Sequence, residues 1–147
     1  MKLMKTLAAV AMLGAALVSQ AGAEEPLSVE QTYQEMQSAF GTVPGFMKAY
    51  PKSAITGMWQ VTKNFEMSDK TALDGKTKAL IGIAVAAQIP CRYCIWLDTE
   101  TAKQHGASEA EIAEAVTVAA MTRHWSTVIN GMQIDFETFK SEFGGGS

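Results

Sequence analysis

The segment Leu80–Ala87 is almost wholly apolar, and this restricts the fold of the chain more than any other feature. Ile81, Ile83 and Val85 alternate with smaller residues, a pattern that would also suit a β-strand. The length of the segment, its alanines and the lack of a partner strand elsewhere in the sequence favour a helix over about residues 76–88. A helix that is apolar on every side is expected to be buried in the core or in a subunit interface.

The segments on either side of this helix also have helical patterns. Ser28 and Ser108 each begin a capping box, which Gln31 and Glu111 complete three residues later. Residues 41–51 contain Pro-Gly and are expected to form a loop with one helical turn. The other segments predict helices over about 28–40, 53–65, 91–105, 109–125 and 127–143. The predicted fold class is therefore all-α.

The first residues are expected to form a secretory signal that is not part of the fold. Lys2 and Lys5 precede an apolar run over 7–18, and Ala21-Gly22-Ala23 has the small-residue pattern of a cleavage site. The run is shorter than the roughly 20 residues of a transmembrane helix. We expect a signal peptide at 1–23, a single helical domain at 24–143 and a tail at 144–147. This arrangement predicts a periplasmic or secreted protein, and an uncleaved membrane anchor is the alternative.

The charge of the chain excludes some classes of partner. The net charge is −3, and removal of the two lysines of the signal segment makes it more negative. An acidic chain with scattered lysines argues against binding to nucleic acid or to an anionic membrane surface.

Cys91 and Cys94 are the two cysteines of the chain, and two residues separate them. This spacing allows both sulfur atoms to lie on one turn at the start of a helix, where a reactive disulfide can open and close. Free N–H groups and the helix dipole favour a thiolate at that end. The pair therefore indicates thiol chemistry. In an oxidising compartment a purely structural disulfide is the alternative.

The cysteine helix and its neighbours resemble the carboxymuconolactone decarboxylase / alkylhydroperoxidase D-like family, most clearly over residues 74–130. The residues that carry the resemblance are Cys91, Tyr93, Cys94, Ala102, Gly106, Ala107, Ser108, Glu111 and Ile112. The resemblance implies an all-helical, alkylhydroperoxidase D-like bundle that assembles into homo-oligomers. It also implies a thiol-dependent peroxidase or disulfide reductant. Cys94 would then meet peroxide, and Cys91 would form the disulfide and exchange with a dithiol donor.

Two positions depart from the pattern of the family's peroxidases. Asp98 stands where those members have a histidine, four residues after the second cysteine, and Ala79 stands where they have a glutamate. In the family these two groups form a proton relay. An ionised aspartate one turn from a thiol would raise the pKa of that thiol by like-charge repulsion. Asp98 is therefore a candidate site residue, and a solvated helix carboxylate is the alternative.

His124 is the candidate that could replace the missing histidine. If the cysteine helix and the helix that starts near residue 109 form an antiparallel hairpin, position 124 lies level with position 90, beside the cysteine pair. Arg123 or Arg92 would then supply local positive charge. A hydrogen-bonded helix histidine with no chemical role is the alternative.

The sequence leaves three kinds of function open. One is an exported thiol–disulfide oxidoreductase with peroxide-reducing activity, which would act on a peroxide or disulfide substrate. Another is a decarboxylase-like lyase or small-molecule-binding protein in which the disulfide only braces the fold. The third is an oligomeric interaction protein without chemistry of its own. The residues imply no bound cofactor. The two histidines are far apart and no second cysteine pair is present, so a metal site is not indicated.

Overall fold

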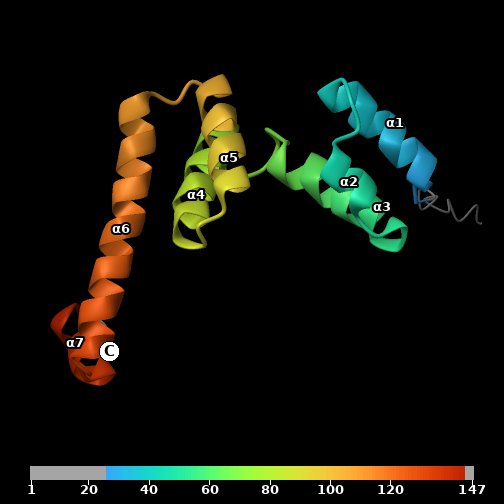
Figure 1. Cartoon of the computed structure of the whole chain (residues 1–147). Helices are drawn as coiled ribbons and strands as arrows, with labels where there is room; N and C mark the ends of the chain where they lie inside the picture. The colour runs from blue at the N-terminus through green and yellow to red at the C-terminus, as the bar shows by residue number, and fades with distance from the viewer. Residues whose placement is uncertain (1–25, 145–147) are drawn as a thin grey trace, which may run out of the picture.

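The computed structural model describes residues 26–144, so the expected signal peptide lies outside the described residues. The described chain is helical and contains no strand (Figure 1). This confirms the all-α prediction. The elements are α1 (Val29–Phe40), α2 (Gly45–Ala49), α3 (Lys52–Val61), the π-helix η1 (Thr62–Glu66), α4 (Gly75–Gln88), α5 (Arg92–Gln104), α6 (Glu109–Gly131) and α7 (Phe136–Glu142).

Side-chain caps explain where most of the longer helices begin. The capping boxes predicted at Ser28 and Ser108 are both present, at the starts of α1 and α6. The carboxylate of Asp74 accepts the N–H of Thr77 at 2.7 Å and begins α4. These bonds satisfy N–H groups that would otherwise lack a partner at a helix N-terminus.

The C-terminal part differs from the sequence prediction. Residues 109–131 form one continuous helix, α6, instead of two helices that meet near residue 126. The hydroxyl of Thr127 donates to the carbonyl of Arg123 at 2.9 Å, so this threonine is accommodated inside the helix. The helix ends at Gly131, and Gln133 then takes a positive φ of 54° before α7 begins.

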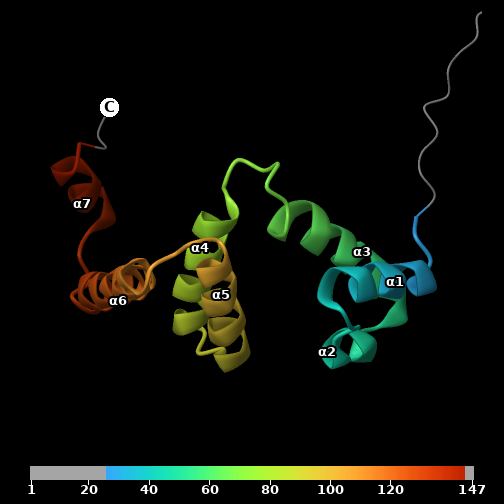
Figure 2. The ribbon, with the colours of Figure 1, turned by 90° about the horizontal axis from the view of Figure 1, so that it is seen from above.

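The described residues contain two separate apolar clusters. Met36, Ile55 and Trp59 join α1 to α3 in the N-terminal part. Ala79, Ile83, Ala102 and Ala107 join α4 to α5 and to the turn before α6. Figure 2 shows these two parts side by side, linked by the segment that follows α3.

The ammonium of Lys78 holds this link against α4. It donates to the carbonyls of Phe65 at 2.8 Å and Ser68 at 2.6 Å, and to the hydroxyl of Thr71 at 2.9 Å. One side chain of α4 thereby fixes both η1 and the connector after it. This contact positions η1 next to the cysteine-bearing half of the molecule.

Helix α4 is the central element of the C-terminal part, because both α5 and α6 pack against it. The expected hairpin of α5 and α6 is therefore replaced by an arrangement in which α6 lies along α4 (Figures 1 and 2). The apolar character of α4 explains the difference, since it offers a packing surface to two neighbours. Gln88 connects the pair at one end. Its amide donates to the carbonyl of Ala119 at 2.9 Å and accepts from Nε of Arg123 at 2.8 Å.

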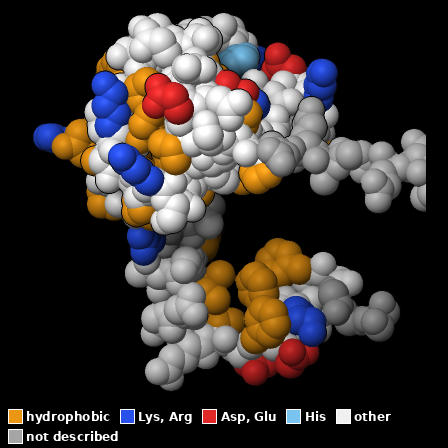
Figure 3. Space-filling view, turned by 90° about the vertical axis from the view of Figure 1, so that its right-hand side faces the viewer, with side chains coloured by type: hydrophobic (Ala, Val, Ile, Leu, Met, Phe, Trp, Pro, Cys, Tyr) orange, Lys and Arg blue, Asp and Glu red, His pale blue; other side chains and the backbone are white. Residues whose placement is uncertain are grey.

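Many large apolar side chains remain exposed, and the far end of α6 projects beyond α4 with α7 beside it (Figure 1). Figure 3 shows hydrophobic side chains on this projecting end. Met132 is 70% exposed and Phe136 is 67% exposed. Further exposed apolar residues on α4, α5 and α6 are Ile81, Val85, Tyr93, Trp96, Leu97, Val118, Met121 and Trp125. Within the described part of the chain, no helix is both long and apolar enough to span a membrane.

Candidate functional site

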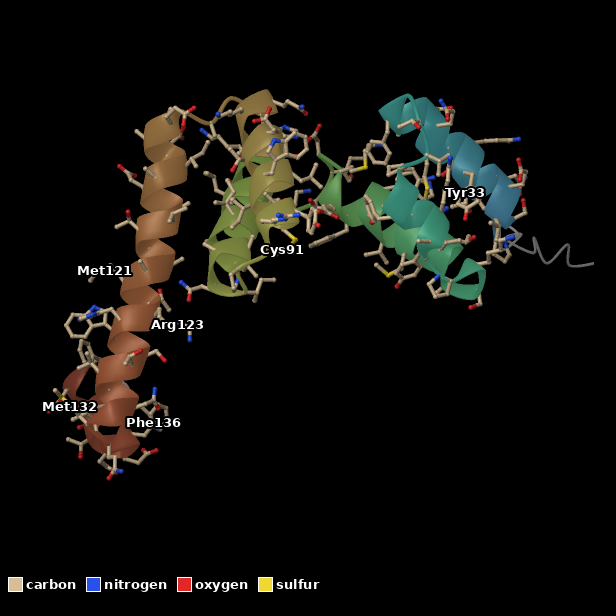
Figure 4. The ribbon with its side chains drawn as sticks, viewed as in Figure 1. Tyr33, Cys91, Met121, Arg123, Met132 and Phe136 are labelled. Carbon is tan, nitrogen blue, oxygen red and sulfur yellow. A yellow bond between two sulfur atoms is a disulfide. The ribbon has the colours of Figure 1, made fainter. Side chains whose placement is uncertain are left out.

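The two cysteines form a disulfide at the junction between α4 and α5 (Figure 4). Their Cα atoms are 5.4 Å apart, and both residues are half-buried. A disulfide that spans one helical turn and is partly exposed is open to attack by the thiolate of another molecule. The pair thus has the location and the accessibility that thiol exchange requires.

Backbone groups of both helices hold Cys91 in place. Its N–H donates to the carbonyl of Ala86 at 3.0 Å, and its Sγ accepts the N–H of Cys94 at 3.3 Å. Cys91 is the N-cap residue of α5, which confirms the predicted position at a helix start. After reduction, the N–H groups and the positive end of the helix dipole stabilise a thiolate there.

Two aromatic residues close to the cysteines in the sequence have exposed side chains. Tyr93 is 73% exposed and Trp96 is 67% exposed. The guanidinium of Arg92 lies 4.9 Å from the centre of the Tyr93 ring and donates to its hydroxyl at 3.1 Å. The first turns of α5 therefore expose two aromatic rings and one guanidinium group, which are side chains that suit contact with another protein surface.

The carboxylate of Asp98 lies one turn after Cys94 and enters a gap in α4. The gap exists because residue 82 is glycine: a β-carbon at Gly82 would lie 2.7 Å from Oδ2 of Asp98. Ala102, one turn further along α5, is fully buried in the cluster with α4. Residues four apart share a helix face, so Cys94, Asp98 and Ala102 form one stripe along α5.

Glu66, the last residue of η1, brings a second carboxylate to this region. Burial raises the pKa of Asp98, and the negative charge of Glu66 raises it further. π-Helical turns are rare and occur frequently at functional sites. The stripe next to the disulfide thus carries a half-buried carboxyl group with an acidic neighbour.

Ala79 lies deep in the contact between α4 and α5. It is 5% exposed and packs in one cluster with Ile83 and Ala102. A methyl group cannot transfer a proton. At this position the structure therefore has packing where the resemblance implies a relay carboxylate.

The structure does not bring His124 to the disulfide within one chain. The residue before it, Arg123, is the one that reaches α4, through Gln88. Successive helix residues point about 100° apart. His124 is exposed, and its ring lies edge-on to Trp125 with centroids 5.0 Å apart. In Figure 4, Cys91 lies on the side of α5 that faces η1, whereas α6 lies on the other side of the α4–α5 pair.

Sequence reasoning missed Glu66, Gly82 and Gln88 as residues that shape this region. Glu66 and Gly82 belong to elements that precede the cysteine pair. The fold places Gly82 against the carboxyl group of Asp98, and the charge of Glu66 acts on the pKa of that group. The glycine inside an otherwise apolar helix was the one available signal, since such a glycine often marks a close approach.

No group of three or more potential metal ligands occurs in the described part of the chain. Two surface hollows lie in the N-terminal part, and one of them is lined by Glu35, Trp59 and Lys63. Neither of these two hollows is lined by Cys91 or Cys94.

The model of the carboxymuconolactone decarboxylase family matches residues 55–135, which is more than half of the chain. This chain belongs to the carboxymuconolactone decarboxylase family. The match includes η1, the cysteine pair and α6. The family resemblance predicted from the residues around the cysteine pair is thereby confirmed.

A solved structure and a curated protein are similar to this chain. The alkylhydroperoxidase AhpD core from Rhodospirillum rubrum has a TM-score of 0.64 at 23% identity, covering 76% of this chain and 85% of that one. It shows that the fold is of the alkylhydroperoxidase type. "Uncharacterized protein 4 in cox locus" of Paracoccus denitrificans is 44% identical over 52 residues, 35% of this chain. The match spans 47% of that relative's length, which is less than half.

Proposed function

We propose that this protein is a thiol–disulfide oxidoreductase whose Cys91–Cys94 pair cycles between dithiol and disulfide. The observation that carries the proposal is the half-exposed disulfide at the N-terminus of α5, where a thiolate is stabilised. A dithiol donor supplies the electrons. A disulfide or a peroxide accepts them.

In the donor half-reaction, a donor thiolate attacks the sulfur of Cys91 and the electron pair of the S–S bond leaves on Cys94. The second donor thiol then releases Cys91 as a thiol and becomes a disulfide with the first. In the acceptor half-reaction with a peroxide, the Cys94 thiolate takes one oxygen atom and an alcohol or water departs. Cys91 then attacks the sulfenic acid, a second water leaves and the disulfide forms again.

Of the two acceptors, a disulfide is the better supported. Ala79 and Asp98 replace the relay groups that the family's peroxidases use, and the exposed Tyr93 and Trp96 offer a contact surface for a protein partner. Disulfide exchange requires no protonation of a departing hydroxide. We therefore expect slow turnover of peroxide and faster exchange with dithiols.

The reduction potential of the disulfide tests the proposal. We expect a value of about −120 to −270 mV, the range of catalytic pairs, together with one thiol pKa below the ordinary value for cysteine. A potential below about −300 mV, with no lowered thiol pKa, is typical of structural disulfides and contradicts exchange chemistry.

Single serine variants then separate the roles of the two sulfur atoms. Cys91→Ser treated with peroxide is expected to stop at a sulfenic acid on Cys94, a gain of one oxygen atom in the intact mass. Cys94→Ser treated with glutathione disulfide is expected to retain one glutathione as a mixed disulfide on Cys91, while the other glutathione leaves as a thiol. The reverse assignment follows if Cys94→Ser forms the sulfenic acid.

A lyase or small-molecule-binding function is the second candidate. The hollow lined by Glu35, Trp59 and Lys63 favours it, because the indole N–H and the ammonium both bind the Glu35 carboxylate there, at 2.6 and 2.8 Å. This function does not need the sulfur atoms. The double variant with serine at both cysteine positions would keep it and would lose thiol exchange.

Assembly and location complete the proposal. We propose that copies of this chain associate through the exposed apolar faces of α4, α5 and α6, since monomers rarely expose so much apolar surface. We also propose export to the periplasm or the medium, which rests on the apolar run over 7–18 and the cleavage pattern after it.

A further inference from the structure

We propose that the hollow lined by α1, α3 and η1 binds a neutral small molecule that has an apolar body and a hydroxyl or carboxamide group at one end. The inference deepens the second candidate function and rests on it, since it names the ligand class of that hollow. It does not depend on thiol exchange. In Figure 2 this part of the chain lies apart from α5, which carries the cysteines.

The hollow has the size and the lining of a small-molecule site. Its volume is about 620 Å³, within the range of roughly 300–1,000 Å³ that is typical of ligand pockets. Leu27, Ala39 and Met67 contribute apolar side chains to the lining. Small-molecule sites are mostly apolar, with a few polar groups that fix the orientation of the ligand. The lining therefore suits a ligand with a hydrocarbon body.

Glu35 and Lys63 supply the charged groups of the hollow. Both side chains are partly exposed, at 35% and 37%, and the two charged groups are 2.8 Å apart. Lys63 belongs to η1, and π-helical turns occur frequently at functional sites. Hydrogen bonds from Lys63 and Trp59 lower the pKa of Glu35, so its carboxyl group is ionised at neutral pH. The hollow thus contains one positive and one negative charge side by side.

Both donors bind the same oxygen atom of Glu35. Trp59 is 1% exposed, and its indole N–H donates to Oε2 at 2.6 Å. The ammonium of Lys63 donates to the same Oε2 at 2.8 Å. Among the described residues, no group donates to Oε1, and the other two N–H groups of Lys63 have no acceptor. One acceptor atom and two donor groups are therefore left for a ligand.

These groups favour a neutral ligand over a charged one. A hydroxyl or a carboxamide can donate to Oε1 of Glu35 and accept from Lys63 at the same time. A ligand carboxylate would be attracted by Lys63 and repelled by Glu35, and a ligand ammonium would experience the reverse. Neither charged group gains a net attraction that offsets the loss of its hydration. The ion pair therefore disfavours a charged ligand, while the apolar lining binds the body of a neutral one.

Four six-carbon compounds test this preference, because they differ only in the group at one end: 1-hexanol, hexanamide, hexanoate and hexylamine. The readout is the ¹H–¹⁵N NMR signal of the Trp59 indole, whose N–H lies at the ion pair. We expect saturable shifts of this signal with 1-hexanol and hexanamide. The two charged compounds should bind about fivefold more weakly, the factor that corresponds to one like-charge contact at about 4 Å in water. The exposed indoles of Trp96 and Trp125 are internal controls, and their signals should not move.

Two variants should change the preference in opposite directions. Glu35→Gln leaves the ammonium without a carboxylate, so hexanoate should become the strongest ligand. Lys63→Met leaves the carboxylate without an ammonium, so hexylamine should become the strongest ligand. Lys63→Met retains the acceptor of the Trp59 indole, so it serves as the test if Glu35→Gln fails to fold. Glu30→Gln is the matched control, because it removes a carboxylate of α1 that lines the other hollow, and it should keep the wild-type preference.

Three results would overturn the inference. One is the absence of a saturable shift of the Trp59 signal with all four compounds. Another is an equal shift of all three indole signals, which would mean contact with apolar surface in general. The third is the same order of affinities in Glu35→Gln, Lys63→Met and wild type.

The outcomes also separate this inference from the proposed functions. Stronger binding of hexanoate or hexylamine to the wild type would contradict the ligand class, but it would keep the hollow as a small-molecule site. The variant with serine at both cysteine positions should bind 1-hexanol as the wild type does, and loss of binding there would contradict a site that is independent of the sulfur atoms. Failure of thiol exchange in the wild type would contradict the oxidoreductase function alone.

Discussion

At the scale of single residues, the environment of Asp98 depends on residues from other elements. Gly82 provides the space for its carboxyl group, and Glu66 provides the neighbouring charge. The position of Asp98 relative to Cys94 could be predicted from the sequence, because both lie on one helix. The contributions of Gly82 and Glu66 could not, because they arise from how α4 and η1 pack on that helix.

Substitution of Gly82 tests this close approach. Alanine normally stabilises a helix interior relative to glycine by about 0.5–1 kcal/mol, but at position 82 its β-carbon would meet the Asp98 carboxylate. We expect Gly82→Ala to be less stabilising than Gly57→Ala by about 1–2 kcal/mol in urea unfolding. Gly57 is the matched control, since a β-carbon there meets open space.

The Asp98→Ala background completes this test. Without the carboxylate, Gly82→Ala should gain the ordinary helix stabilisation, and a double-mutant cycle measures the difference. Equal effects of Gly82→Ala in both backgrounds would show that the close approach does not contribute to the free energy of unfolding.

The raised pKa of Asp98 makes a prediction about stability and pH. Between the unfolded pKa and the higher folded pKa, the folded chain binds more protons than the unfolded chain. The contribution of Asp98 to the free energy of unfolding therefore falls as pH rises through this window. Asp98→Asn should remove that fall, so its stability relative to wild type should increase from acid to neutral pH.

Asp135 gives a control of opposite sign. The N–H and hydroxyl of Thr138 lower the pKa of its carboxyl group. Its stabilising contribution is present at neutral pH and is lost as the pH falls through the lowered folded pKa. Asp135→Asn should therefore lose stability relative to wild type as pH rises, and a common trend in both variants would contradict the assignment.

At the scale of elements, the sequence predicted the helices well where a local signal marks their ends. Ser28 and Ser108 begin helices with the capping boxes that their sequences contain. The prediction failed near residue 126, where it placed the boundary between two helices. Polar side chains there bond to carbonyls of the preceding turn inside the helix, and the helix continues to Gly131.

The cap of α6 predicts a specific loss of stability. Ser108→Ala should lower the free energy of unfolding by about 1 kcal/mol, because the N–H of Glu111 loses its acceptor at 3.2 Å. Ser126→Ala, in the interior of the same helix, is the control and should be neutral or slightly stabilising. Thermal or urea unfolding of the two variants decides this, and equal effects would exclude a role for the cap.

The partner of Ser108 adds a pH dependence at the same helix end. Bonds from Lys76 and from the N–H and hydroxyl of Ser108 lower the pKa of Glu111 to about 2. Its contribution is thus complete above its ordinary pKa of 4.5 and is lost as the pH falls towards 2. In Glu111→Gln, urea unfolding at a series of pH values should no longer show this decrease in the free energy of unfolding at acid pH.

At the scale of the whole molecule, the apolar faces indicate how the chain completes its core. The apolar character of residues 76–88 predicted burial in the core or in a subunit interface, and α5 and α6 leave Ile81 and Val85 about half exposed in the single chain. Positions 118, 121 and 125 form a second apolar stripe on α6, and in Figure 4 Met121 points away from α4. How the helices pair could not be predicted, because every face of α4 is apolar and each can accept a neighbour.

Met121→Lys tests whether this stripe is an interface between copies of the chain. A charge placed there should dissociate the assembly, which sedimentation or light scattering would detect. The melting temperature of the wild type should then depend more strongly on protein concentration than that of Met121→Lys. Ala120→Lys is the control, since position 120 is turned about 100° from the stripe. Unchanged assembly in Met121→Lys would exclude this face as the interface.

The closeness of Gly82 and Asp98 also has a consequence for how relatives of this chain diverge. The carboxyl group fills the volume that a side chain at position 82 would need. The residue at each of the two positions therefore limits which substitutions the other position accepts. An aspartate at 98 in this orientation is therefore less costly to stability in an ancestor that already has a glycine at 82. Among descendants, loss of one residue removes the constraint on the other, and the pair should be inherited or replaced as a unit.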